Sequence, residues 1–208
     1  MDEDKWINNK YSSKWEKYKR FSTWNYRKVS KNNIPKYSAG ILPYTYDLSG
    51  NCLFLLGKDT EEDWSDFGGR CEIKDNNDSI LTASREFYEE TLGSVLNIKE
   101  CINKINLYDK KIISKTLNGS PYYMYIVYID YLNYSEYFNK TSEFIKYSFN
   151  NEKTQINKFI EKINIKWVTI DTLLNCLENK NIKTNITLRS VFYKTLEICK
   201  EELIYLIR

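Results

Sequence analysis

Two short segments rich in apolar and aromatic residues, 38–46 and 52–57, flank the polar stretch 47–50, which ends in Gly50. Apolar runs of this length around a glycine-containing turn are typical of two strands joined by a tight connection. Residues 64–70 contain three glycine or aspartate positions among aromatics, and we expect them to form a loop. The pattern therefore predicts that a sheet begins near residue 38.

Helical spacing takes over after this loop. Asp78 or Ser79 can cap the start of a helix that runs to about residue 92, and Gly93 can end it. The expected packing stripe of this helix consists of Ile80, Ala83, Ser84, Phe87 and Thr91. Three glutamates of the same helix are expected to lie mostly off that stripe.

The rest of the chain alternates between strand-like and helix-like spacing of apolar residues. Residues 111–117 and 122–132 form an expected hairpin around Asn118 and Gly119. Further expected elements are a helix at 135–149, a strand at 163–170, a short helix capped by Asp171, and an amphipathic helix at 188–207. Strands mixed with helices in this way predict an α/β domain of α/β/α layers with a mixed sheet.

Composition excludes several kinds of site. The 208 residues include no histidine, which rules out Ser-His-Asp catalysis and histidine-ligated zinc. The five cysteines have no C-x-x-C spacing, so we expect buried free thiols and a reducing, cytoplasmic setting. No segment has the roughly 20 apolar residues of a membrane span, and we expect no membrane partner.

The first 36 residues differ from the remainder. They hold ten lysines and arginines against four acidic residues, while the whole chain carries only +3. Trp6, Tyr11, Trp15, Tyr18 and Trp24 are interleaved with these charges. We therefore expect a basic aromatic N-terminal arm at 1–36 followed by a domain at 37–208. The arm can bind RNA through phosphates and stacking, or its aromatics can dock it onto the domain.

Three carboxylates dominate the expected helix 79–92. Glu86, Glu89 and Glu90 are three and four residues apart, so they project from one helical face. Like charges this close repel one another unless a cation neutralises them. Oxygen ligands of this kind suit Mg²⁺, with Mn²⁺ as the alternative. A solvated helix face is the plain alternative, and an EF-hand frame fails because Ile80 stands where that loop needs glycine.

Residues 69–93 resemble the Nudix box, G-x5-E-x7-R-E-U-x-E-E-x-G-U, of the Nudix hydrolase superfamily. The R-E-U-x-E-E core is complete from Arg85 to Glu90, and Gly68-Gly69-Arg70-Cys71-Glu72 is similar to the usual start of the box. The resemblance implies the Nudix fold and hydrolysis of a pyrophosphate that joins a nucleoside diphosphate to another group. It also implies metal ligation by Glu86, Glu89, Glu90 and the Gly69 carbonyl, with Arg85 orienting the carboxylates.

The box departs from the family pattern at its first glutamate. Gly69 and Arg85 are 16 positions apart where the pattern has 14, and Asn77 stands at the position of that glutamate. Glu72 and Asp78 are the nearby acids, and Asp78 can substitute after a small loop shift. A further acid often comes from a later loop in this family, for which Glu161 and Glu152 are candidates.

The substrate is less defined by the sequence. Arg70 can meet a phosphate, and Trp64 or Phe67 can either stack on a base or pack in the core. Three functions remain open: a hydrolase of a small nucleotide, an mRNA decapping hydrolase that uses the arm for RNA, and a catalytically weak Nudix-fold binding module. For the second function, the richness of the chain in Asn, Ile, Lys and Tyr, together with Gly68-Gly69-Arg70 at the start of the box, loosely resembles Nudix decapping enzymes of large DNA viruses.

Overall fold

The computed structural model describes residues 36–108, 110–150, 152–156, 159–178 and 186–207. The chain divides into two units, Met1–Ile34 and Pro35–Arg208, and the fold below is that of the second. The predicted arm, apart from Lys36, lies outside the described residues.

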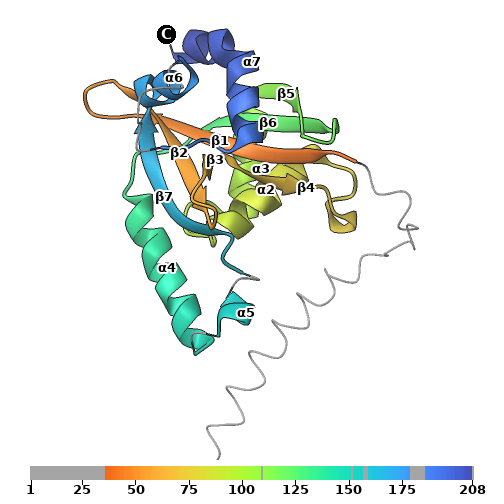
Figure 1. The fold of residues 1–208 in the computed structure, drawn as a ribbon, viewed down its shortest axis with the longest axis vertical. Coiled ribbons are helices and arrows are strands. Elements are labelled where there is room, and N and C mark those ends of the chain that lie inside the picture. The colour runs from red at the N-terminus through yellow and green to blue at the C-terminus, as the bar shows by residue number, and fades with distance from the viewer. Residues whose placement is uncertain (1–35, 109, 151, 157–158, 179–185, 208) are drawn as a thin grey trace, which may run out of the picture. The chain divides into compact units, whose positions relative to one another are not determined.

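A mixed sheet of seven strands forms the centre of the described part of the chain (Figure 1). Its central strand is β1 (Ser38–Tyr46), which runs parallel to β6 (Pro121–Tyr128). On its other side β1 divides between two antiparallel partners. Its first half pairs with β4 (Phe67–Arg70) and its second half with β2 (Cys52–Asp59).

The remaining strands extend the sheet at both edges. β5 (Lys111–Lys115) pairs with β6, as the predicted hairpin requires. β2 also pairs with β7 (Lys162–Thr169) and with the short β3 (Trp64–Ser65). The predicted loop at 64–70 is therefore wrong, because it contains β3 and β4. Its glycines hide the strand from a propensity argument, since strand pairing with β1 outweighs their weak local preference.

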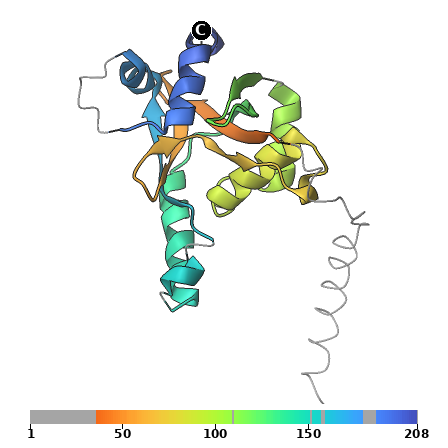
Figure 2. The ribbon, with the colours of Figure 1, turned by 45° about the vertical axis from the view of Figure 1, so that its right-hand side comes forward.

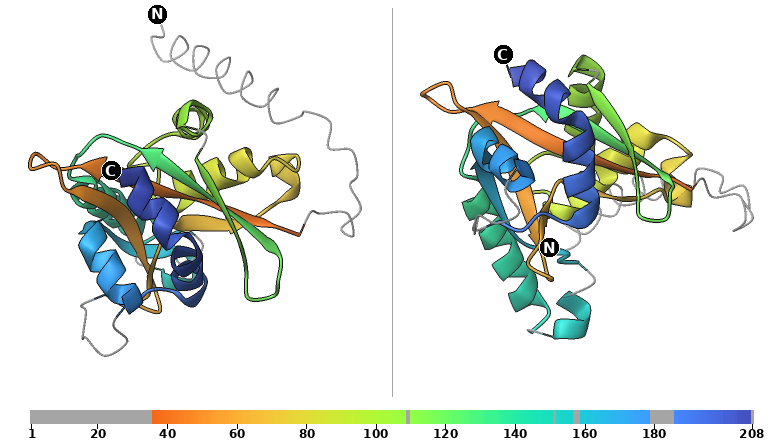
Figure 3. Two further views of the ribbon diagram at one scale, coloured as in Figure 1. Left: turned by 90° about the horizontal axis from the view of Figure 1, so that it is seen from above. Right: turned by 45° about the horizontal axis from the view of Figure 1, so that its top comes forward.

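Helices cover both faces of the sheet (Figure 3). On one face α2 (Ser79–Glu90) and α3 (Ile98–Tyr108) enclose a core that includes Ile41, Leu55, Phe67 and Phe87. On the other, α6 (Ile170–Glu178) and α7 (Ser190–Ile207) enclose a core that includes Phe54, Met124, Phe192 and Leu196. The predicted α/β/α layers are confirmed, although α3 was not predicted.

α4 (Tyr134–Ser148) packs against β7 and ends beyond the sheet beside α5 (Lys153–Ile156) (Figures 1 and 2). Figure 2 shows this pair standing clear of the layered part of the domain. None of the helices in the described ranges has both the length and the apolar content needed to cross a membrane. The cysteines among these residues are unpaired, and all but Cys176 are buried.

Candidate active site

The Nudix-box glutamates lie where α2 meets β4. The helix begins at Asp78, whose carboxylate accepts hydrogen bonds from the Ile80 and Leu81 amides at 2.8 and 3.3 Å. It stops before Gly93, which has φ +65°, a conformation that favours glycine. Both ends lie within two residues of the sequence pattern, and the side of the helix with Glu86 and Glu90 faces the glycines of β4.

Gly69 is required by the position of Glu86. A Cβ atom at residue 69 would lie 2.5 Å from the Glu86 carboxylate, so this carboxylate rests directly against the glycine backbone. Glu86 Oε1 also contacts Arg85 Nη1 at 2.8 Å. Burial raises the pKa of Glu86 to about 7, against the opposing effect of Arg85.

Glu90 is more deeply buried, with 5% of its side chain exposed. Its Oε2 accepts the Gly68 N–H at 2.8 Å, and its Oε1 lies 3.4 Å from Lys162 Nζ. Burial raises the pKa of Glu90 to about 8; Lys162 lowers it, and the negative charge of Glu86 raises it further. The prediction that Glu90 lies mostly off the packing face is therefore wrong, because α2 presses it against β4.

Arg85 holds the region around the two glutamates together. Its guanidinium donates to Asp75 Oδ1 and Oδ2 at 2.8 and 2.9 Å, to Glu89 Oε2 at 2.8 Å, and to the Arg70 carbonyl at 2.9 Å. Burial works against ionisation of Asp75, but the bonds from Arg85 outweigh it and hold its pKa below the usual range. The expected contact between Arg85 and Glu89 is thus present.

Asp75, which the sequence analysis did not single out, is the acid that pairs with the box arginine. It is 1% exposed and lies ten positions before Arg85, two more than the eight positions of the box pattern. The prediction that Asp78 substitutes is wrong because its carboxylate caps α2. Glu72 is half exposed, and its nearer partner is Lys74 at 3.2 Å.

The other candidate acids occupy different surroundings. Glu89 is 47% exposed and lies between Arg85 and Lys74. Glu161 is exposed, and its charge contributes to the raised pKa values of Glu86 and Glu90. Glu152 is exposed just before α5 and does not line the pocket described next.

A pocket of about 290 Å³ opens beside Glu90. Its lining residues come from four separate segments: Asp59, Thr60, Glu61, Glu90, Ile160, Glu161, Lys162 and Arg189. Lys162 and Arg189 supply positive charge opposite the carboxylates. Neither residue could be predicted from the sequence, because an isolated lysine in a strand and an isolated arginine before a helix have no spacing that marks them.

A second buried acid lies near this pocket. Asp66 is 5% exposed and accepts a short hydrogen bond from the Tyr122 hydroxyl. Burial raises the pKa of Asp66 to about 6, while Tyr122, Lys162 and Arg189 oppose that rise. The buried Glu90 and Asp66 and the partly buried Glu86 are therefore three carboxyl groups that hold protons more strongly than exposed ones.

The carboxylates fit a divalent cation of the Mg²⁺ type. Within the described ranges no three acidic or cysteine side chains form a closed metal-binding group. Mg²⁺ does not need one, since it is commonly held by one or two carboxylates together with water and substrate phosphates. Glu86 and Glu90 offer such a partial site. Their carboxylates lie against Gly69 and Gly68, which are neighbours in the chain, and burial raises their affinity for protons.

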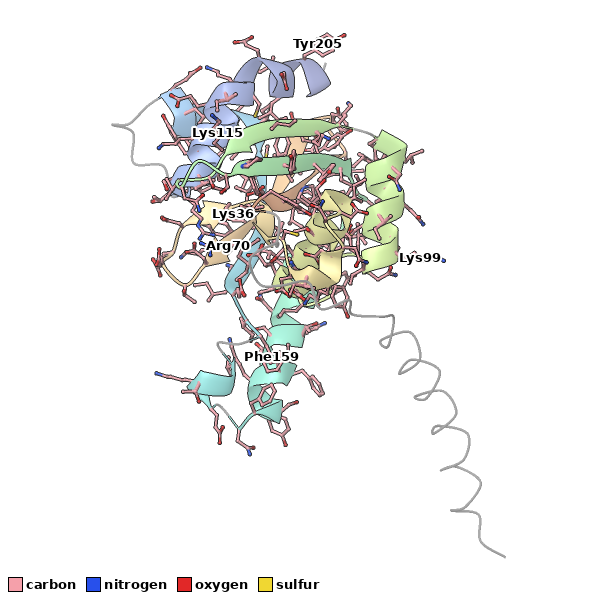
Figure 4. The ribbon with its side chains drawn as sticks, turned by 90° about the vertical axis from the view of Figure 1, so that its right-hand side faces the viewer. Lys36, Arg70, Lys99, Lys115, Phe159 and Tyr205 are labelled. Atoms are coloured by element: carbon pink, nitrogen blue, oxygen red, sulfur yellow. The ribbon has the colours of Figure 1, made fainter. Side chains whose placement is uncertain are left out.

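The predicted substrate contacts are only partly available. Arg70 is exposed at the end of β4, and Figure 4 labels it beside Lys36. Phe67 is 0% exposed and packs edge-on against Phe87. Trp64 is 5% exposed, with Lys166 Nζ 4.3 Å above its ring. Stacking of either ring on a base is therefore wrong, because both rings belong to the core.

Nudix hydrolases are among the solved structures that this chain resembles. A Nudix hydrolase from Nitrosomonas europaea is 16% identical with a TM-score of 0.42, and the match covers 82% of this chain and 73% of that one. RenU, a Nudix hydrolase from M. smegmatis, is 11% identical with a TM-score of 0.44, covering 81% and 86%. A C. elegans Ap4A hydrolase is 15% identical with a TM-score of 0.43, covering 81% and 98%.

No protein-family profile matches the sequence, and no curated protein matches it either.

Proposed function

We propose that this chain is a Mg²⁺-dependent Nudix hydrolase that cleaves a pyrophosphate bond between a nucleoside diphosphate and another group. The observation that carries the proposal is the placement of the partly buried Glu86 against Gly69 and of the buried Glu90 against Gly68, where Glu90 lines a pocket with two cationic side chains. A merely solvated acidic helix face would leave these carboxylates in water.

Each residue has a role in this proposal. Glu86, Glu90 and the Gly69 carbonyl would hold the metal, which neutralises phosphate charge and activates water when bound. Arg85 keeps the carboxylates in place through Glu86 and Glu89. Arg189 faces the same pocket and would bind a phosphate of the substrate. Glu161, exposed at the pocket, is the acid best placed to accept a proton from water.

Two other functions keep support from particular observations. An mRNA decapping hydrolase would use the net positive, aromatic residues 1–36 for RNA. A Nudix-fold binding module is favoured by the contact between Lys162 and Glu90, because a protein cation already faces one of the expected metal ligands.

The test is hydrolysis by the purified full chain with and without Mg²⁺. The panel contains capped RNA, free cap analogue, nucleoside diphosphate sugars and dinucleoside polyphosphates. Glu90→Gln is the inactive control, and we expect it to lower turnover by at least about a hundredfold. Glu152→Gln is the matched control, since this exposed glutamate lies outside the pocket and its loss should leave the rate unchanged.

The outcomes separate the three functions. Turnover of a small nucleotide supports the main proposal, and release of cap from RNA but not from free analogue supports decapping. In the second case deletion of residues 1–36 should harm capped RNA far more than a free dinucleotide. Absence of turnover on the whole panel, or equal rates for Glu90→Gln and the unchanged chain, would contradict the hydrolase.

A further inference from the structure

Lys162 is the most deeply buried lysine that the described residues contain, with 2% of its side chain exposed. It is the first residue of β7, and its aliphatic chain fills the space beside Gly57. A Cβ atom at residue 57 would lie 3.0 Å from Lys162 Cδ, so the glycine leaves room for the lysine. The fold therefore accommodates this side chain along its length.

The ammonium group of Lys162 ends at two acceptors. It donates to Ser65 Oγ at 2.8 Å and lies 3.4 Å from Glu90 Oε1. Burying a charged ammonium is costly unless an opposite charge and hydrogen bonds compensate. A leucine or methionine would fill the same space without this cost, so packing alone does not explain the lysine.

Both carboxylate oxygens of Glu90 have partners within the protein. One carboxylate oxygen accepts the Gly68 amide, and the other faces Lys162. The protein itself thus supplies a cation to the carboxylate that the Nudix-box pattern assigns to metal. Glu86, by contrast, is turned toward Gly69, and its cationic neighbour is Arg85 at 2.8 Å.

We infer that Lys162 is a built-in cation that takes the place of one divalent ion at Glu90. The free chain then binds one ion fewer than the carboxylates would otherwise hold. This inference rests on the proposed function, since it assumes that Glu86 and Glu90 form a metal site. Lys162 is a positioning residue in this scheme, because its ammonium group neutralises Glu90.

Counting bound Mn²⁺ on the full chain in the absence of nucleotide tests the inference. Titration followed by electron paramagnetic resonance reports free Mn²⁺, and its difference from total Mn²⁺ gives the number of ions bound per chain. We expect Lys162→Met to bind one Mn²⁺ ion more per chain than the unchanged protein. Lys166→Met is the matched control, because Lys166 lies on the same strand over Trp64 and away from Glu90. It should leave the number unchanged.

Lys162→Gln serves as a second variant, since it keeps a hydrogen-bond donor for Ser65 and removes the charge. It guards against loss of folding in the methionine variant, and melting curves check both. An unchanged Mn²⁺ number in a folded Lys162 variant would overturn the inference while leaving the proposed hydrolase intact. Absence of Mn²⁺ binding by the unchanged protein would overturn both.

Discussion

Arg85 joins three parts of the chain through one guanidinium. It bonds to Asp75 before α2, to Glu89 within α2, and to the carbonyl of Arg70 at the end of β4. Because Arg85 and Asp75 are both buried, water cannot replace either partner. The positions of Glu86 and Glu89 on α2 are therefore tied, through Arg85, to the buried Asp75.

Asp75→Asn should lower the free energy of unfolding by about 3 kcal/mol, since it leaves a buried arginine without its closest partner. Asp78→Ala removes only a helix cap and should cost about 1 kcal/mol. Guanidinium denaturation of both variants measures the difference. Equal losses, or a larger loss for Asp78→Ala, would show that Asp75 does not have the role assigned to it.

At the scale of elements, the pairing of β1 with β4 depends on glycines. Gly40 and Gly68 face each other across the two strands, and a Cβ atom at Gly68 would lie 2.6 Å from the Gly40 Cα. Gly69 instead faces the helix and the end of the Glu86 side chain. The same strand pair thus contains one glycine contact that serves the fold and one that serves the site.

Gly69→Ala should reduce turnover about a hundredfold with little loss of stability, because the flexible Glu86 side chain can move away from the new methyl group. Gly40→Ala should instead destabilise the fold by about 2 kcal/mol, since its methyl group would meet the backbone of Phe67 and Gly68. We therefore expect Gly69→Ala to lower the rate with little change in melting temperature, and Gly40→Ala to lower the melting temperature clearly. A large loss of stability in Gly69→Ala would refute the distinction.

Most elements could be predicted from local patterns. The first strand of the hairpin, the capped helix α2 and the late strand β7 lie within two residues of their expected bounds, whereas the second hairpin strand, β6, ends four residues before the expected residue 132. β3 and β4 could not be read in this way, because only their pairing with β2 and β1 makes strands of them. α3 was missed although Cys101, Ile102 and Ile105 have helical spacing.

The candidate site likewise has a part that the sequence predicts and a part that it does not. The helix spacing was enough to place Glu86 and Glu90 together, since a helix fixes neighbours three and four residues apart. Asp66, Lys162 and Arg189 meet them only through the tertiary fold. No local pattern can predict such an encounter.

On the scale of the whole domain, burial makes the carboxyl groups of the site sensitive to pH. Asp66, Glu86 and Glu90 have pKa values raised to about 6, 7 and 8. In the unfolded chain they would lose their protons near their ordinary values of about 4. Between these limits the folded chain binds more protons than the unfolded one, so rising pH favours unfolding.

The free energy of unfolding without divalent metal should therefore decrease as the pH rises from about 5 to about 8. Urea denaturation across this range, with a chelator present, measures the slope. Glu90→Gln should flatten its upper part, and saturating Mg²⁺ should reduce the whole slope because a bound cation stabilises the ionised carboxylates. A stability that stays level or rises with pH in the chelator would contradict the assigned burial effects.

The pocket beside Glu90 is built from segments that emerge from the ribosome at very different times during synthesis. Asp59 and Glu90 emerge early, whereas Lys162 and Arg189 come from the last quarter of the chain. Until β7 has emerged, β2 lacks its longest partner and presents an open strand edge. A message interrupted before the codon for Lys162 would yield a polypeptide that carries every residue of the Nudix box and neither cation of the pocket.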